Sequence, residues 1–148
     1  MKTTQSPIQQ KKKSIQKKQI RIVIERSDDS YSAYAESIPG VYGHADTVEE
    51  AKNSALKGIE LLKKYNQDEN IPEILKGDYE IIYKFDAKSF LNFYKKTFTN
   101  AALERMTHIN QKQFHHYATG LKKPRPAQVK KIEAAMHQLG RELLSIEL

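Results

Sequence analysis

The chain of 148 residues contains no cysteine, and it has no apolar run near the roughly 20 residues that a membrane-spanning helix needs. The absence of cysteine excludes a disulfide framework and thiolate metal sites, and it fits a reducing cytoplasm. The amino terminus is charged, but no apolar segment follows it, so a secretion signal is not expected. These features together predict a cytoplasmic protein that does not interact with membranes.

The sequence also lacks the common signatures of catalytic sites. It has no HExxH motif, no glycine-rich loop that could hold a phosphate, and no recognisable Ser-His-Asp grouping. His115 and His116 are neighbours on a predicted helix, where their side chains diverge by roughly 100°, so they cannot bind one metal together. We therefore expect no catalytic residues, no metal site and no cofactor.

Charge is distributed unevenly along the chain, although the net charge is +7. Residues 1–18 carry six lysines and no acid. Residues 19–86 carry eight basic and fourteen acidic side chains, and residues 87–148 carry eleven basic and four acidic ones. The middle part should therefore attract a basic partner, and the last part should attract a nucleic acid.

Residues 1–18 are rich in Lys, Gln, Ser and Thr and contain little that could be buried. Such a segment cannot offset the entropy lost on ordering, so a disordered basic tail is predicted. It could add nonspecific attraction to nucleic acid, or it could have no specific role.

Residues 19–86 are predicted to form a small α+β domain. Thr47 and Glu50 have the spacing of a capping box and mark the start of a long helix whose apolar positions recur at helical spacing. The alternating, β-branched segments around it predict three strands that form an antiparallel meander, and then a fourth strand. The expected order is β-β-β-α-β, with strands at residues 19–26, 31–37, 41–45 and 78–85 and a helix at residues 48–65.

Residues 87–148 are predicted to be all-α. Asp86 can cap a helix over residues 87–98. Two short amphipathic helices follow, at residues 100–107 and about 111–118, with Asn100 as the expected cap of the first and Gly120 ending the second. Phe114 and Tyr117 are expected to face inward. This layout of helix, break and polar helix is that of a helix-turn-helix.

The chemistry of the second helix suits DNA. Asn and Gln side chains can pair with an adenine edge in the major groove, and the basic, proline-containing segment after the helix can contact phosphates. The candidate DNA-binding residues are Asn110, Gln111, Lys112, Gln113, His115, His116, Lys122, Lys123 and Arg125. The stretch resembles the Xre/Cro class of helix-turn-helix, except that His108 stands where a glycine is frequent. An ordinary helical hairpin is the alternative interpretation.

Beyond Pro126, apolar residues at alternating spacings of three and four form a heptad seam. Its first half, Val129 to Met136, should pack on the helices of its own chain. Its second half has more exposed apolar residues than a small domain needs, and we expect it to pair with a second copy. The candidate dimerisation residues are Leu139, Leu143, Leu144 and Ile146.

Residues 20–65 resemble the HicB antitoxin family. The matching features are the strand at residues 31–37, the segment Ile38-Pro39-Gly40-Val41, and the segment Asp46-Thr47-Val48-Glu49-Glu50-Ala51 that leads into the long helix. The resemblance implies a partial ribonuclease H-like fold that binds and neutralises a HicA-type toxin, a basic ribonuclease that cleaves messenger RNA. It also implies that the carboxyl-terminal domain represses the protein's own operon by binding operator DNA.

The candidate toxin contacts are Tyr31, Tyr34, Glu36, Tyr42 and Asp46, which we expect on the exposed side of the sheet, although some of the tyrosines could belong to the core. Two other functions stay open. One is a dimeric transcription regulator whose first domain senses a ligand or oligomerises, with no toxin partner. The other is a nuclease that acts alone, but no converging carboxylate cluster for two metal ions can be identified in the sequence.

Overall fold

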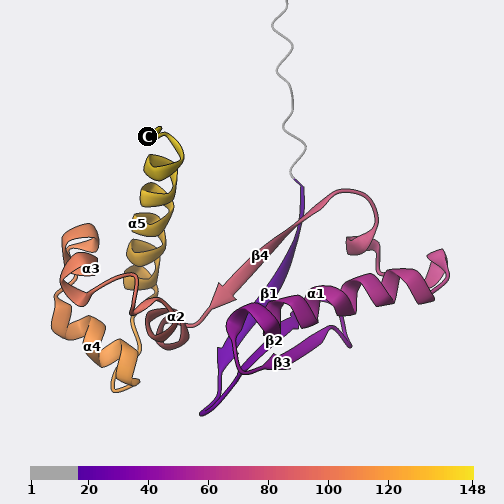
Figure 1. Ribbon diagram of the computed structural model, residues 1–148, viewed down its shortest axis with the longest axis horizontal. Coiled ribbons are helices and arrows are strands. Elements are labelled where there is room, and N and C mark those ends of the chain that lie inside the picture. Colours follow the sequence, from indigo (N-terminus) through magenta and orange to yellow (C-terminus); the bar gives the residue numbers. More distant parts are fainter. Residues whose placement is uncertain (1–16) are drawn as a thin grey trace, which may run out of the picture.

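The computed structural model describes residues 17–148, and it is a mixed α+β structure with a four-stranded sheet and five α-helices (Figure 1). The strands are β1 Lys18–Arg26, β2 Tyr31–Ala35, β3 Tyr42–Ala45 and β4 Tyr79–Phe85. The helices are α1 Val48–Tyr65, α2 Ala87–Tyr94, α3 Asn100–Thr107, α4 Gln111–Thr119 and α5 Pro126–Leu144, with two 3₁₀ turns, η1 Asp68–Asn70 and η2 Glu73–Leu75. The predicted tail lies outside the described residues, apart from Lys17 and Lys18, and Lys18 begins β1.

The sheet has the strand order β3-β2-β1-β4. Strands β1, β2 and β3 form the predicted antiparallel meander, and β4 lies parallel to β1, with Ile20 opposite Ile81. Two parallel neighbours cannot be joined by a tight turn, so the chain must cross over between them. The segment that contains α1 makes this crossover.

One face of the sheet is covered by α1. Thr47 caps the helix by accepting a hydrogen bond from the backbone N–H of Glu50 at 3.2 Å, as the capping-box spacing predicts. The Glu50 carboxylate reaches back to Thr47 but accepts from its hydroxyl, at 3.0 Å. Alternate residues of β1 face the helix because side chains of a strand alternate between its two faces. The resulting core contains, among others, Ile20, Ile22, Ile24, Ala33, Val48, Ala51, Ala55 and Ile59.

Helix α2 is shorter than the predicted span of residues 87–98. Asp86 caps it as expected, by accepting from the backbone N–H of Ser89 at 2.7 Å. The helix ends at Tyr94, whose carbonyl accepts hydrogen bonds from the N–H groups of Thr97 and Phe98, so the chain turns there. The turn redirects the chain, so that α4 can pack against both α2 and α3.

Both hydrophobic cores receive side chains from α2. Phe93 packs against the core under the sheet, where its ring stacks on Phe85 with centroids 5.9 Å apart. Leu91 belongs to a second core together with Leu103, Ile109, Phe114, Tyr117 and Ile132. Ser89 adds a polar link, because its hydroxyl accepts from the backbone N–H of Arg26 at 3.2 Å. The helix therefore joins the sheet to α3, α4 and α5.

The helices at residues 100–107 and 111–119 agree closely with the predicted bounds. The predicted cap of the first is wrong by one residue. Thr99, and not Asn100, accepts the hydrogen bond from the backbone N–H of Ala102, at 3.1 Å. Thr99 has the extended backbone that a capping residue requires, whereas Asn100 is already helical. None of the helices from residue 17 onward is long and apolar enough to cross a membrane.

Candidate nucleic-acid and protein interfaces

Helix α4 presents polar side chains to solvent along one side. Gln111, Lys112 and His115 are exposed, and Phe114 and Tyr117 are buried against the other helices, as predicted. His116, another candidate DNA contact, is half-buried. Its Nδ1 atom is buried and has no hydrogen-bond partner among residues 17–148.

The first turn of α4 is held by two side chains. The Oδ1 atom of Asn110 accepts from the backbone N–H of Lys112 at 2.8 Å, and the Glu104 carboxylate accepts from the backbone N–H of Gln111 at 2.6 Å. Asn110 therefore serves as the helix cap, and its oxygen is already engaged. Gln113, also a candidate for base contacts, is half-buried. The side chains free to meet a duplex at this end are Gln111, Lys112 and His115.

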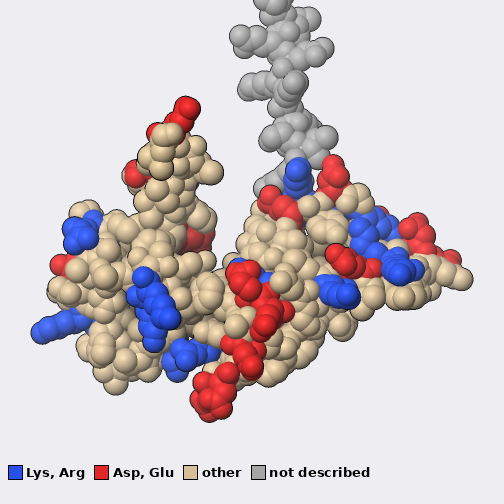
Figure 2. All heavy atoms as spheres, viewed as in Figure 1, with Lys and Arg blue, Asp and Glu red and all other residues tan. Residues whose placement is uncertain are grey.

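A basic segment follows α4. Gly120 ends the helix with a positive φ of 79°, and the backbone N–H of Lys122 then bonds to the carbonyl of His116, which turns the chain towards α5. Lys122, Lys123 and Arg125 are all exposed. Basic side chains stand out on the part of the molecule built from α3, α4 and α5, whereas acidic and basic side chains mix over the sheet (Figure 2).

The face of the sheet that α1 does not cover carries a hydrogen-bonded polar layer. Tyr34 donates to the Glu25 carboxylate at 3.0 Å, and Lys84 forms a 2.9 Å ion pair with Glu36. Tyr42 is 57% exposed, and its hydroxyl lies 3.1 Å from that of Ser32. The hydrogen bond to Glu25 and the nearby negative charge raise the pKa of Tyr34, because both disfavour the phenolate.

The five predicted toxin contacts do not form one cluster. Tyr34, Glu36 and Tyr42 lie together at this open face. Tyr31 packs instead against the core on the α1 side, where its ring meets Phe93 edge-on at 6.4 Å. It alternates with Ser32 and therefore faces away from it. Asp46 follows the end of β3 just before the cap of α1 and is exposed. Tyr31 is therefore one of the tyrosines that belong to the core, the alternative left open by the sequence, and Asp46 lies beyond the sheet.

A groove of about 780 Å³ separates β4 and α2 from α5. Its apolar lining includes Ile82 of β4, Phe90 and Tyr94 of α2, and Val129 and Met136 of α5. The charged side chains at its borders are Arg21, Lys52, Lys84, Glu133 and His137. Sequence reasoning missed this groove, because it depends on how α5 is placed relative to a sheet edge far away in the chain.

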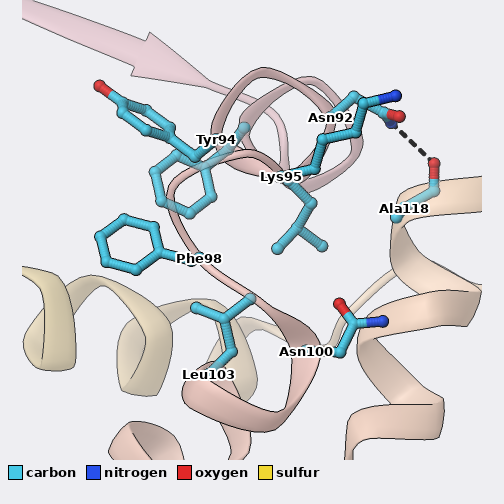
Figure 3. Close-up of a pocket in the computed structure, with 9 residues that line it drawn as sticks. Asn92, Tyr94, Lys95, Phe98, Asn100, Leu103 and Ala118 are labelled. Carbon is cyan, nitrogen blue, oxygen red and sulfur yellow. Dashed lines mark hydrogen bonds between the residues drawn. The ribbon is translucent and has the colours of Figure 1, made fainter.

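A smaller cavity of about 190 Å³ lies between α2, α3 and α4 (Figure 3). The Asn92 side chain at its border donates hydrogen bonds to the carbonyls of Lys88 and Ala118, both at 2.8 Å. Its remaining lining is largely apolar and includes Leu91, Phe98 and Leu103. Because the amide donors of Asn92 are already used, we regard the cavity as a packing gap between helices.

The end of α5 projects into solvent. Ile132 is buried and Met136 packs on the second core, as predicted for the first half of the seam, but Val129 is 41% exposed. Leu139 is half-buried. Leu143, Leu144 and Ile146 are 58%, 89% and 58% exposed. These residues form an apolar surface that no other part of the described chain covers.

Among residues 17–148, no group of three or more His, Cys, Asp or Glu side chains is placed to hold a metal ion. Comparisons of the chain with models of known protein families, with curated proteins and with solved structures find no match.

Proposed function

We propose that this protein is an antitoxin of the HicB type, which neutralises a HicA-type, mRNA-cleaving toxin and represses its own operon. The observation that carries the proposal is the pair α3 and α4. The turn between these two helices leaves the polar start of α4 free of any covering element and places a basic segment directly after it. In this proposal the pair is a helix-turn-helix of the Xre/Cro kind, and α4 is its recognition helix.

In the proposed DNA complex, Gln111, Lys112 and His115 meet base edges in the major groove. A Gln side chain can bond bidentately to adenine, and a Lys can bond to guanine. Gln113, which is half-buried, lies beside these residues on α4. Lys122, Lys123 and Arg125 neutralise phosphates. Pairing of two copies through α5 places two recognition helices on two half-sites.

In this proposal the sheet and α1 neutralise the toxin. Together they form a partial ribonuclease H-like domain. Two features support it: the parallel β4 beside β1, the first strand of the meander, and the surplus of acidic side chains in residues 19–86. The proposed contact surface is the open face around Tyr34, Glu36 and Tyr42. A basic RNA-cleaving protein that docks there loses access to its substrate.

DNA binding is tested by titrating the protein with the duplex upstream of its own gene at several salt concentrations. Replacing Lys122 and Lys123 by Gln should weaken binding to all sequences. It should also flatten the plot of log affinity against log salt by about 1.8, since each lost phosphate contact contributes about 0.9. Lys57→Gln with Lys64→Gln, on the exposed side of α1, is the matched control and should change little. Equal effects of the two pairs would contradict the assignment.

Toxin binding is tested by co-expressing the protein with the adjacent open reading frame. The expected result is rescue of growth together with co-purification of a small basic protein. Tyr34→Ala with Tyr42→Ala should weaken the complex, whereas Tyr65→Ala, a 74% exposed tyrosine at the end of α1, should not. DNA binding without any such partner would favour the alternative, a dimeric regulator.

A further inference from the structure

The groove between β4, α2 and α5 offers apolar surface to a partner, and Arg21 is a cation in its lining that can meet a carboxylate. Its floor is formed by half-buried aromatic side chains, with the rings of Phe90 and Tyr94 only 4.9 Å apart. Ile82 and Val129 extend this apolar surface on either side. Its border carries the cations Arg21, Lys52 and Lys84 against a single carboxylate, that of Glu133, with His137 beside it. Lys84 and Lys52 also pair with Glu36 and Glu49, outside the groove.

An exposed segment with the complementary character lies at the end of the described residues. Residues 142–148 read Glu-Leu-Leu-Ser-Ile-Glu-Leu, in which Glu142 and Glu147 bracket Leu143, Leu144 and Ile146. These three apolar side chains are largely uncovered, and Leu148 is fully exposed. The segment therefore combines unburied apolar surface with two negative charges and no positive one.

The same molecule cannot place this segment in its own groove. The last residue of α5 that lines the groove is His137, and the helix continues straight to Leu144. At about 1.5 Å per residue, Leu143 lies roughly 9 Å beyond His137 and roughly 21 Å beyond Val129 along the helix axis, and the direction of the helix carries it away from the groove. Figure 1 shows the end of α5 pointing away from α2. A second copy that runs antiparallel brings its own segment to the groove.

Gly140 supports this arrangement. It lies inside α5, between the residues that line the groove and the exposed segment, and a Cβ atom added there would meet nothing within 4 Å. A glycine inside a helix costs about 1 kcal/mol relative to alanine, and nothing within one copy requires it. Because glycine has no side chain, the backbone of a second helix can approach closely at this point.

We propose that two copies of this chain exchange their carboxyl-terminal segments, so that residues 142–148 of each lie in the groove of the other. The inference builds on the proposed pairing of two copies and identifies the surface that receives each segment. The contact is the same on both sides, as in a closed dimer with twofold symmetry. It also bridges β4 and α5 across the groove, and so ties the proposed DNA-binding part to the sheet.

Cross-linking tests this geometry directly, because the natural chain has no cysteine. The double variant Val129→Cys, Ile146→Cys should form covalent dimers under mild oxidation, since Ile146 of one copy approaches Val129 of the other. Each single variant should stay largely uncross-linked. Within one chain the two positions are too far apart on the helix to react. Efficient cross-linking of either single variant would indicate parallel pairing of α5 and overturn the proposal.

Sedimentation equilibrium of the full chain provides the second measurement. We expect a dimer that Leu144→Gln with Ile146→Gln weakens at least tenfold, and that Glu142→Gln with Glu147→Gln weakens several-fold. The matched controls are Leu61→Gln with Leu121→Gln, two other exposed leucines, and Glu60→Gln with Glu69→Gln. A monomeric natural chain at about 50 μM, or equal effects of variants and controls, would overturn the proposal. Toxin co-purification with the same variants shows separately whether neutralisation survives.

Discussion

The carboxylate of Glu104 accepts a hydrogen bond from the backbone N–H of Gln111 at 2.6 Å. This contact joins the middle of α3 to the first residue of α4 across the turn between them. Because the start of a helix carries partial positive charge, the carboxylate is favourably placed there. Together with the cap from Asn110, it fixes the direction in which α4 leaves the turn.

Replacing Glu104 by Ala should therefore loosen the start of α4. We expect a loss of about 1 kcal/mol in the free energy of unfolding, as for removal of a helix cap, and weaker binding to the DNA upstream of the gene. Urea denaturation and DNA titration measure the two effects. Glu60→Ala, at an exposed position of α1, is the control and should leave both unchanged.

His108 is the only residue other than glycine with a positive φ in the described chain, at 59°. A left-handed backbone costs an L-residue about 1–2 kcal/mol, and glycine avoids that cost but is more flexible when unfolded. His108→Gly should raise the free energy of unfolding by about 0.5–1 kcal/mol and the melting temperature by a few degrees. His108→Val should lower both, because a β-branched residue tolerates this conformation poorly. A stabilised Val variant would contradict the argument.

Gly43 permits the close contact between β3 and α1. A Cβ atom there would lie 2.5 Å from the carbonyl oxygen of Ala51 and 2.8 Å from the backbone nitrogen of Ala55. Since backbone atoms cannot move aside easily, Gly43→Ala should destabilise the protein by about 1–3 kcal/mol. Gly58→Ala, inside α1, is the matched control, because the nearest atoms to its added Cβ belong to Val41 and are 3.9 Å away. That variant should be stabilised by about 0.5–1 kcal/mol.

The hydrogen bond from Tyr34 to Glu25, followed by partial desolvation and the nearby charges of Glu25 and Glu36, raises the pKa of the Tyr34 phenol. The neutral form is therefore favoured in the folded state. Its contribution to stability is present below the ordinary tyrosine pKa of about 10 and is lost as pH rises through the raised value. The difference in absorbance titration between the natural chain and Tyr34→Phe isolates this group. Glu25→Gln should shift its titration to lower pH, and no shift would contradict the assigned cause.

Much of the fold follows from local patterns in the sequence. The capping box of Thr47 and Glu50 predicted the start of α1, and its helical period predicted the residues that face the sheet. The alternating apolar residues of β1 predicted a strand with one buried face. Such local signals act within a few residues, and for that reason they can be recognised without knowledge of the tertiary structure.

The wrong or missing predictions concern side-chain directions, helix ends and grooves that depend on the tertiary structure. Tyr31 and Tyr34 are three residues apart on β2 and therefore lie on opposite faces of the sheet, so they could not both face the same side. The pairing with β1 decides which of the two faces the core. The end of α2 at Tyr94 depends on how α4 packs against α2 and α3. The groove at β4 forms only when α5 is placed opposite β4 and α2. No short segment of the sequence predicts that placement.

Strand β1, one of the two inner strands of the sheet, can pair with its second neighbour, β4, only after most of the sheet domain has been synthesised. Gln19 and Glu80 are bonded side by side on β1 and β4, although 61 positions separate them. During synthesis, β1 must therefore wait for residues 79–85 to leave the ribosome, and pairing over such a separation is slow. A nascent chain interrupted before Phe85 exposes the unpaired edge of its most hydrophobic strand, which makes truncated products prone to aggregation and open to proteases.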